Sequence, residues 1–239
     1  MSRLSEEIVK EARMLADPQR ENQIKRYFRE PIETYGLTTA QIKMLAKRYY
    51  PRVKGNLDAA MCLAESLLET KNMTLGGIGL EILDRFRGKL GPQHLDAFDR
   101  WVDHLNNWAT TDGLATHMIA ASIAGDPSQV ERLIVWTGSP NRWRRRAAAV
   151  SLVPLARKGH LLEYVLRVAD GLMEDDDDMV QKGVGWLLKE ASKMYPEEIH
   201  DYLLRWRTRA PALVLRIASE KLPKDKRVLK TGARLGASC

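Results

Sequence analysis

Apolar residues recur every three to four positions along almost the whole sequence. In the N-terminal part this spacing is clear within residues 8–16, 42–49 and 60–68. It is the spacing of one face of an amphipathic helix, whereas a half-buried strand would alternate apolar and polar residues. Alternating runs flanked by turn signals are absent from the sequence. The pattern therefore predicts an all-α protein.

Breaks that contain proline interrupt this pattern in the C-terminal half. They directly follow Asp126, Ser139, Tyr195 and Ala210. Proline at the start of a helix costs little, because the N–H group it lacks has no intrahelical partner there. Each break therefore predicts the start of a new helix. No long Gly/Ser linker divides the chain, so we expect a single domain over residues 1–239, ordered to about residue 222 and followed by a basic tail.

Three segments of the C-terminal half resemble one another. They begin at Trp143, Val180 and Leu213, at intervals of 37 and 33 residues, and a step of 34 residues back from Arg146 reaches Asp112. Helical pairs that repeat at this interval are typical of an α-solenoid of the HEAT, armadillo or TPR type. We therefore expect HEAT-like repeats whose inner helices line a concave basic surface. A plain helical bundle is the alternative.

Basic residues are concentrated in the second half of the chain. Residues 1–139 contain 18 basic and 18 acidic residues, whereas residues 140–239 contain 20 and 13, which accounts for the net charge of +7. Such asymmetry indicates a surface for a polyanion, of which DNA and RNA are the commonest. A basic protein without a nucleic-acid partner is the alternative.

Composition narrows the class of protein further. A sequence with 44% hydrophobic and 29% charged residues is typical of a globular protein, and it contains no apolar run near the roughly 20 residues that cross a bilayer. The first residues lack the apolar core of a signal peptide. Cys62 and Cys239 lie far apart, which argues against a disulfide framework or a cysteine zinc site. We therefore expect a cytoplasmic protein.

The repeat register brings candidate functional residues onto one surface. Asp112, Arg146 and Gly183 occupy equivalent positions of successive repeats. Trp108 lies four residues before Asp112, and Trp186 three residues after Gly183, so each indole is expected one turn along the same helix face. The expected surface is a carboxylate flanked by two indoles, with an arginine beside it.

Basic side chains surround this expected surface: Arg142, Arg144, Arg145, Lys182 and Lys189. Arginines at a helix start oppose the helix dipole and repel one another, and bound phosphates would relieve both effects. Gly183 and Gly185 would allow a ligand to approach their helix closely, at about 1 kcal/mol each in helix propensity. Capping and solvation explain the acidic run 174–178, which precedes a predicted helix.

Each candidate also has a purely structural interpretation. Tryptophans on helices more often fill the core than contact a ligand, and we assign that role to Trp101, Trp136, Trp143 and Trp206. Asp112 alone could cap a helix or form a salt bridge. The arginine run could be an exposed helix start. The five histidines show no metal-ligand spacing, and we expect neither a metal nor a cofactor.

Four segments resemble a known family when they are taken in order and with their spacing. They are Tyr35-Gly36-Leu37 with the basic stretch 42–47, NWATTD at 107–112, NRWRRR at 141–146 and KGVGWLLKE at 182–190. Together they resemble the AlkD-like DNA alkylation-repair glycosylases, which are built from HEAT-like repeats. The resemblance implies that Asp112 is the catalytic aspartate, that Trp108 and Trp186 are active-site indoles, and that Arg146 contacts DNA. Thr39, between the two stretches of the first segment, is a further expected DNA contact.

The resemblance also implies a reaction. It is base excision repair of duplex DNA, in which a monofunctional glycosylase hydrolyses the N-glycosidic bond of cationic N3- or N7-alkylated purines without base flipping. The departing base leaves an oxocarbenium-like sugar, which a carboxylate can stabilise while it orients a water. Faces of the two indoles can contact the cationic sugar. A monomer associated with the nucleoid is expected.

The sequence departs from the family pattern at two places. Ala109 stands where some members carry a second tryptophan, and the stretch 70–77 lacks the expected Glu-x-Arg-like pattern. The replacement by Ala109 could weaken the contact with the substrate. The missing pattern at 70–77 leaves open which N-terminal residues contact DNA. Two alternative functions stay open: a non-catalytic DNA-structure-binding paralogue on the same fold, and a HEAT-like scaffold for protein interactions. Steep salt dependence of DNA binding would separate both DNA functions from the scaffold.

Overall fold

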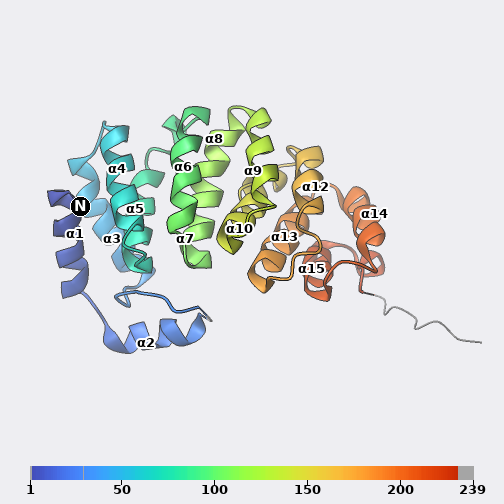
Figure 1. The fold of residues 1–239 in the computed structure, drawn as a ribbon, viewed down its shortest axis with the longest axis horizontal. Coiled ribbons are helices and arrows are strands. Elements are labelled where there is room, and N and C mark those ends of the chain that lie inside the picture. Colours follow the sequence, from blue (N-terminus) through green and yellow to red (C-terminus); the bar gives the residue numbers. More distant parts are fainter. Residues whose placement is uncertain (1, 29, 231–239) are drawn as a thin grey trace, which may run out of the picture. The chain divides into compact units, whose positions relative to one another are not determined.

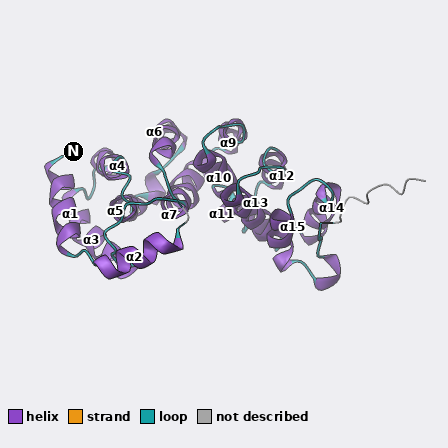
Figure 2. Cartoon of the chain, turned by 60° about the horizontal axis from the view of Figure 1, so that its bottom comes forward, coloured by secondary structure: helices purple, strands orange, loops and turns teal. Residues whose placement is uncertain are grey.

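The computed structural model describes residues 2–28 and 30–230, and within them the secondary structure is helical (Figures 1 and 2). Among the described residues, β-type pairing is limited to one isolated bridge between Glu33 and Asn72. The prediction of an all-α fold is therefore confirmed. The end of the predicted basic tail, residues 231–239 with Cys239, lies outside the described residues.

The helices form two compact units, which divide after Asp126. The prediction of one continuous domain stays a prediction. The α-helices of the first unit are α1 (Arg3–Met14), α2 (Pro18–Tyr27), α3 (Thr39–Tyr49), α4 (Leu57–Leu68), α5 (Met73–Asp84), α6 (Leu95–Trp101), α7 (Trp108–Gly113) and α8 (Ala120–Ala124). Its shorter elements are the 3-10 turns Tyr50–Arg52, Arg87–Lys89, Pro92–His94 and Val102–His104, and a π-helical turn, Leu114–Ile119.

Side-chain caps determine where several helices of the first unit begin. Thr38 and Gln41 form a capping box at the start of α3, and the Asn72 side chain accepts hydrogen bonds from two backbone N–H groups of α5. Asn107 accepts from the N–H of Thr110 at 3.0 Å. Such caps satisfy backbone donors that have no intrahelical partner. The Asn107 cap makes Trp108 the first residue of α7.

Helix α5 is central to the packing of the first unit, where it contacts α3, α4 and α7. A Cβ atom at Gly79 would lie 3.1 Å from the Cα of Ala64 on α4. Glycine at this position therefore allows the two backbones to approach closely. Fully buried Phe98 and Trp101 on α6 add to the core.

The second unit contains α9 (Val130–Trp136), α10 (Arg142–Val150), α11 (Val153–Ala156), α12 (Leu162–Asp170), α13 (Asp178–Ala191), α14 (Pro196–Trp206) and α15 (Ala212–Ala218). Its 3-10 turns are Pro127–Gln129, Ser219–Lys221 and Lys224–Lys226. The four predicted helix starts are confirmed: Pro127 begins a 3-10 turn that leads into α9, Asn141 caps α10, Pro196 begins α14 and Pro211 precedes α15.

Helix α13 lies between α10 and α15 and contacts both (Figures 1 and 2). A Cβ at Gly183 would lie 3.4 Å from Cγ of Arg146, so these two residues lie side by side on neighbouring helices, as the predicted register requires. That they occupy equivalent positions of a repeat stays a prediction. A Cβ at Gly185 would lie 2.7 Å from Cβ of Ile217 on α15. The expectation that the two glycines admit a ligand is therefore wrong: they admit neighbouring helices.

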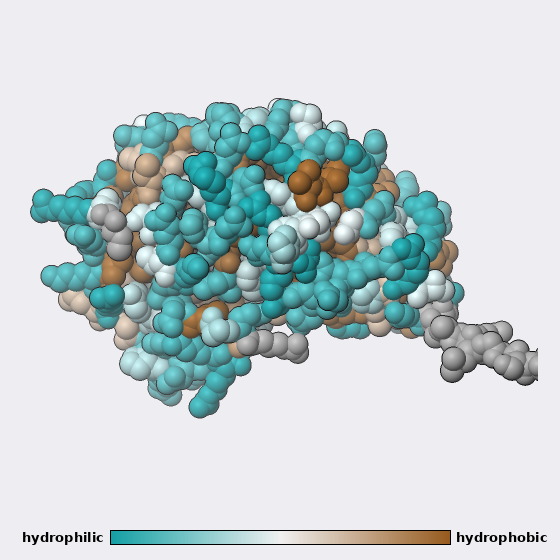
Figure 3. Space-filling view, viewed as in Figure 1, coloured by the Kyte–Doolittle hydropathy of each residue, from teal (hydrophilic) through white to brown (hydrophobic). Residues whose placement is uncertain are grey.

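Three of the four tryptophans expected to pack in the interior are buried, namely Trp101, Trp136 and Trp143. Trp206 is half-buried, with the guanidinium of Arg209 4.6 Å from its ring centroid. Hydrophilic residues cover most of the face shown in Figure 3. Among the described residues, no helix combines the length and the apolar character that a membrane span requires.

Candidate functional site

Helix α7 carries the first pair of candidate residues. Trp108 is its first residue and Asp112 lies one turn later, so the two side chains share a face as predicted. Both side chains are half-buried, with the flanking Thr110 and Thr111 buried. The same helix thus contributes its threonines to the core and its tryptophan and aspartate to the surface.

Two aromatic residues from the end of α2 pack against Trp108. The ring of Phe28 stacks on the indole, with centroids 5.2 Å apart and planes inclined by 11°. Tyr27 meets the indole edge-on at 6.3 Å and 71°, and 74% of its surface is exposed. The sequence interpretation missed both residues. The sequence does show an aromatic pair, Tyr27-Phe28, at the end of an otherwise polar stretch, but this pattern does not indicate Trp108 as the partner.

The π-helical turn Leu114–Ile119 follows directly after α7. The hydroxyl of Thr116 donates to the backbone carbonyl of Asp112 at 2.6 Å. Isolated π turns of this kind are rare and are frequently found at functional sites. The turn gives the helix an additional residue, beginning two positions after the candidate catalytic aspartate.

A polar cluster lies beside this turn. Nδ1 of His117 is 2.9 Å from Oδ1 of Asp84, and Arg87 donates to the same carboxylate. Burial raises the pKa of Asp84, but the hydrogen bonds from His117 and Arg87 outweigh it and lower the pKa below its usual range. The cluster borders a cavity of about 120 Å³ that Gly113 also lines. Sequence reasoning did not identify this cluster.

Thr39, the N-terminal residue expected to contact DNA, is exposed at the first position of α3. Lys43, one turn later on the same helix, is also exposed, and its Nζ lies 4.0 Å from the carboxylate of Glu81. The start of α3 is therefore an accessible surface with a basic side chain next to it.

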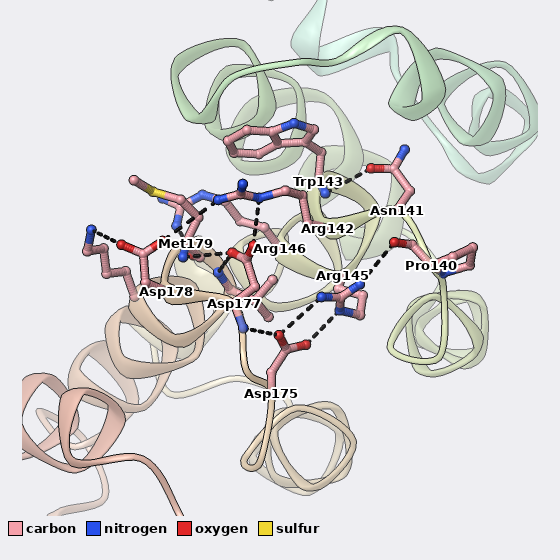
Figure 4. A network of polar contacts seen from close by, with 12 residues as sticks. Pro140, Asn141, Arg142, Trp143, Arg145, Arg146, Asp175, Asp177, Asp178 and Met179 are labelled. Carbon is pink, nitrogen blue, oxygen red and sulfur yellow. Dashed lines mark hydrogen bonds and ion pairs between the residues drawn. The ribbon is translucent and has the colours of Figure 1, made fainter. Parts of the chain in front are cut away.

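Arginines of α10 face aspartates at the start of α13 in the second unit (Figure 4). Arg145 holds both oxygens of Asp175, with Nε–Oδ2 and Nη2–Oδ1 distances of 2.6 and 3.1 Å, and its Nη1 donates to the carbonyl of Ser139. The hydrogen bond to Asp175 raises the pKa of Arg145 despite its burial. Arg145 is thus anchored within the protein.

The neighbouring arginine, Arg142, has the same kind of partner. Its Nε lies 2.8 Å from Oδ2 of Asp177, and its Nη2 lies 3.7 Å from Oδ1 of Asp178. Lys182 reaches Oδ2 of Asp178 at 3.1 Å. Asp177 also caps α13 by accepting from the N–H groups of Met179 and Val180, as predicted for the acidic run. The expectation that capping and solvation suffice to explain this run is wrong, because three of its carboxylates neutralise cations of the predicted DNA surface.

The other predicted DNA contacts of the second unit differ in exposure. Arg146 is buried and donates from Nη1 to the carbonyl of Met179. The guanidinium of Arg144 lies 5.2 Å from the ring centroid of Trp136, and Nζ of Lys189 lies 3.2 Å from the carboxylate of Glu220. Trp186 is half-buried on α13. Contact of these residues with DNA stays a prediction, as does the adjacency of Asp112 and Arg146, which belong to different units.

The sequence matches the profile of the DNA alkylation repair enzyme family over residues 8–222. The chain belongs to this family. Its fold is similar to that of a predicted DNA alkylation repair enzyme from Enterococcus faecalis, with a TM-score of 0.75 over 87% of this chain and 97% of that one. The two sequences are 16% identical, so this likeness concerns the fold. A comparison with curated protein sequences finds no match.

Membership of the DNA alkylation repair family indicates which roles the described surfaces should be considered for. The match includes the elements that carry the candidate residues, from α3 in the first unit to α13 in the second. An enzyme of DNA alkylation repair needs a surface for DNA and a group that acts on the damaged nucleotide. The arginine-rich start of α10 and the Trp108–Asp112 face of α7 are the candidates for these two roles.

Proposed function

We propose that this DNA alkylation repair protein is a monofunctional glycosylase. It hydrolyses the N-glycosidic bond of cationic N3- or N7-alkylated purines in duplex DNA, and it acts without flipping the base into a pocket. The observation that carries this proposal is the face of α7, where the partly exposed Trp108 and Asp112 lie one turn apart. A carboxylate can stabilise an oxocarbenium-like sugar electrostatically, and the face of a neighbouring indole can contact its positive charge.

In this proposal Asp112 supplies the chemistry. Alkylation at N3 or N7 makes the purine cationic and a good leaving group, so no acid is needed to protonate it. Its departure leaves positive charge on the deoxyribose, which the Asp112 carboxylate stabilises while it orients the attacking water and accepts the proton that this water loses. Neither a metal nor a cofactor is required for these steps.

Trp108 supplies a surface for the cationic sugar. A ring face in contact with a cation stabilises it by about 0.5–2 kcal/mol, depending on desolvation. Phe28 stacks in parallel on the indole and supports its plane, while the ring of Tyr27 lies at 71° to the indole with its centroid 6.3 Å away. The opposite face of the indole is the one that the sugar contacts in this proposal, and Trp186 of the second unit provides a second indole for the same lesion.

Side chains of both units bind the DNA backbone in this proposal, and those of the second unit are basic. Thr39 contacts one strand from the exposed start of α3. The contacts of the second unit are made by Arg142, Arg144, Arg145, Arg146, Lys182 and Lys189. Contacts with phosphates determine register and orientation rather than sequence preference. The enzyme is proposed to act as a monomer on cytoplasmic, nucleoid-associated DNA.

Base release tests this proposal. Duplex DNA methylated to carry 7-methylguanine and 3-methyladenine is incubated with the protein, and free bases are quantified by chromatography. Wild type is compared with Asp112→Asn and with Asp58→Asn, which removes an exposed carboxylate from the first turn of α4. Release by wild type and Asp58→Asn, lost in Asp112→Asn with DNA affinity retained, is the expected result.

Two other outcomes would change the conclusion. Salt-sensitive DNA binding without release from any variant would indicate the non-catalytic DNA-structure binder. Absence of both release and binding would contradict each DNA function and favour the scaffold for protein interactions.

A further inference from the structure

The cations and carboxylates between α10 and α13 fall into a buried half and an exposed half. In the buried half, the side chains of Arg145 and Asp175 are 16% and 6% exposed and form a two-point contact. In the exposed half, Arg142, Asp178 and Lys182 have side chains that are 32%, 32% and 39% exposed. The two halves therefore differ in how readily solvent ions or a ligand can reach them.

We propose that a phosphate of the DNA backbone binds between Arg142 and Lys182, at the position that the Asp178 carboxylate holds in the protein without DNA. DNA binding then exchanges one anion for another. This inference rests on the proposed function, since it specifies how one strand is held. It goes beyond that function by assigning Asp178 a role: its carboxylate competes with the phosphate for Arg142 and Lys182.

The geometry of Asp178 supports the exchange. Its two oxygens serve different cations, with Oδ1 3.7 Å from Nη2 of Arg142 and Oδ2 3.1 Å from Nζ of Lys182. These oxygens mark where an anion sits between the two side chains (Figure 4). A phosphate presents more acceptor oxygens than a carboxylate and can satisfy both cations at shorter distances.

Neighbouring contacts hold Arg142 in place during such an exchange. Its Nε is paired with Asp177 at 2.8 Å, and its guanidinium lies 4.9 Å from the ring centroid of Trp143. Asp177 caps α13, so its position is fixed by two backbone N–H groups. Asp178 follows the cap and can turn away from Arg142 without uncapping the helix. The guanidinium thus stays oriented while its outer partner changes.

The strengths of the ion pairs favour Asp178 as the exchanging group. Partly exposed ion pairs are weak, because water and salt compete with them, whereas a buried two-point pair is costly to break. Arg145 and Asp175 are therefore expected to stay paired when DNA binds, so that a phosphate contact of Arg145 would add to this pair and not replace it. The pair of Arg142 with Asp178, at 3.7 Å, is the longest of these contacts.

A comparison of two aspartates tests the proposal. Asp176 lies two residues before Asp178, is exposed, and makes no hydrogen bond or ion pair in the described part of the chain. Asp178→Asn and Asp176→Asn therefore change the net charge equally, but only the first removes the competitor. Affinity for an undamaged fluorescent duplex is measured by anisotropy at several salt concentrations, so the readout does not depend on catalysis.

We expect Asp178→Asn to strengthen DNA binding by about three- to tenfold, and Asp176→Asn to change it by less than about twofold. The dependence of log affinity on log salt should become steeper in Asp178→Asn by up to about 0.9, the value of one phosphate contact. Arg142→Gln should abolish the gain when it is combined with Asp178→Asn. Thermal unfolding verifies that each variant is folded, and Asp178→Ser replaces Asp178→Asn if that variant is not.

The outcomes separate this inference from the proposed function. Equal gains in Asp178→Asn and Asp176→Asn would show an effect of net charge and overturn the exchange. A gain that persists in the double variant with Arg142→Gln would overturn it as well. Neither result would bear on the proposed function, which is tested separately by base release from wild type and Asp112→Asn. Absence of DNA binding by wild type and all variants would overturn the exchange and the proposed function together.

Discussion

The indole of Trp108 and the phenyl ring of Phe28 lie almost parallel, with their centroids 5.2 Å apart. Phe28 follows the last residue of α2, and Trp108 is the first residue of α7, so the contact joins the ends of two helices. Phe28 is buried while Trp108 is half-buried. The buried ring thus supports one that is available to a ligand.

Removal of this support should reduce base release. Phe28→Leu keeps an apolar side chain but loses the ring pair, which is worth about 0.5–1.5 kcal/mol. If the orientation of Trp108 matters in the transition state, kcat/KM should fall by about 2- to 12-fold. The measurement is base release from methylated duplex DNA at a temperature where the variant is fully folded.

Phe98→Leu is the matched control for that variant. Phe98 is fully buried on α6 and pairs with Trp101 at 5.2 Å, in the core of the same unit. Both substitutions should lower the unfolding temperature, but only Phe28→Leu should slow base release in the folded protein. Equal rates for the two variants would show that Phe28 contributes to stability alone.

Gly185→Ala should destabilise the protein. The added Cβ would lie 2.7 Å from Cβ of Ile217, so α13 and α15 would have to separate. Overpacking of this kind costs about 1–3 kcal/mol, which exceeds the gain in helix propensity of about 1 kcal/mol. The unfolding free energy is measured by urea denaturation.

The control for this substitution is Gly77→Ala on α5, where the nearest heavy atoms, on Ile42, lie at 3.7 Å. That contact is ordinary, and the variant should be unchanged or more stable by up to about 1 kcal/mol. A ligand-contact role for Gly185 would instead give a stable protein with weakened DNA binding.

Glu190→Gln should lower stability at neutral pH but have less effect in acid. Glu190 is buried on α13, and its carboxylate accepts from Lys193 at 2.6 Å and Arg157 at 2.8 Å. Burial raises the pKa of Glu190, but these two hydrogen bonds outweigh it and lower the pKa. A lowered pKa means that the folded state favours the ionised form.

The lowered pKa of Glu190 determines how its contribution to stability depends on pH. The stabilisation by Glu190 is complete above the pKa of an unfolded glutamate, about 4.3, and is lost as the pH falls through the lower folded pKa. We expect Glu190→Gln to cost about 1–2 kcal/mol at pH 7 and less below pH 4. Glu220→Gln, which removes the exposed partner of Lys189, should cost less than about 0.5 kcal/mol at either pH. A constant deficit for Glu190→Gln across this pH range would contradict the role of its charge.

Local signals account for the parts of the structure that could be predicted from the sequence. Asn141 and Pro196 start helices by short-range backbone chemistry, and the four-residue spacing of Trp108 and Asp112 places them on one face of any helix. The proximity of Arg146 and Gly183 could be predicted from the interval of 37 residues, because residues one repeat apart are expected on neighbouring helices.

Contacts between distant segments could not be predicted in this way. The pairing of Phe28 with Trp108 depends on how a polar helix folds back, which no periodicity records. The role of Gly185 cannot be predicted from the sequence, because a glycine required by a neighbouring helix and one required by a ligand look alike there. Arg145 and Asp175 lie 30 residues apart, close to the repeat interval, so a comparison of charges one repeat apart could have found this pair.

The π-helical turn Leu114–Ile119 has a consequence for the angular phase of the helix that contains it. An inserted residue shifts everything after it by about 100° around an α-helical axis. Asp112 before the turn and Ile123 after it can therefore satisfy two different requirements, one toward the surface and one toward the core. Deleting one residue within the turn would bring these two halves back into a single phase and force one of them to face the wrong side.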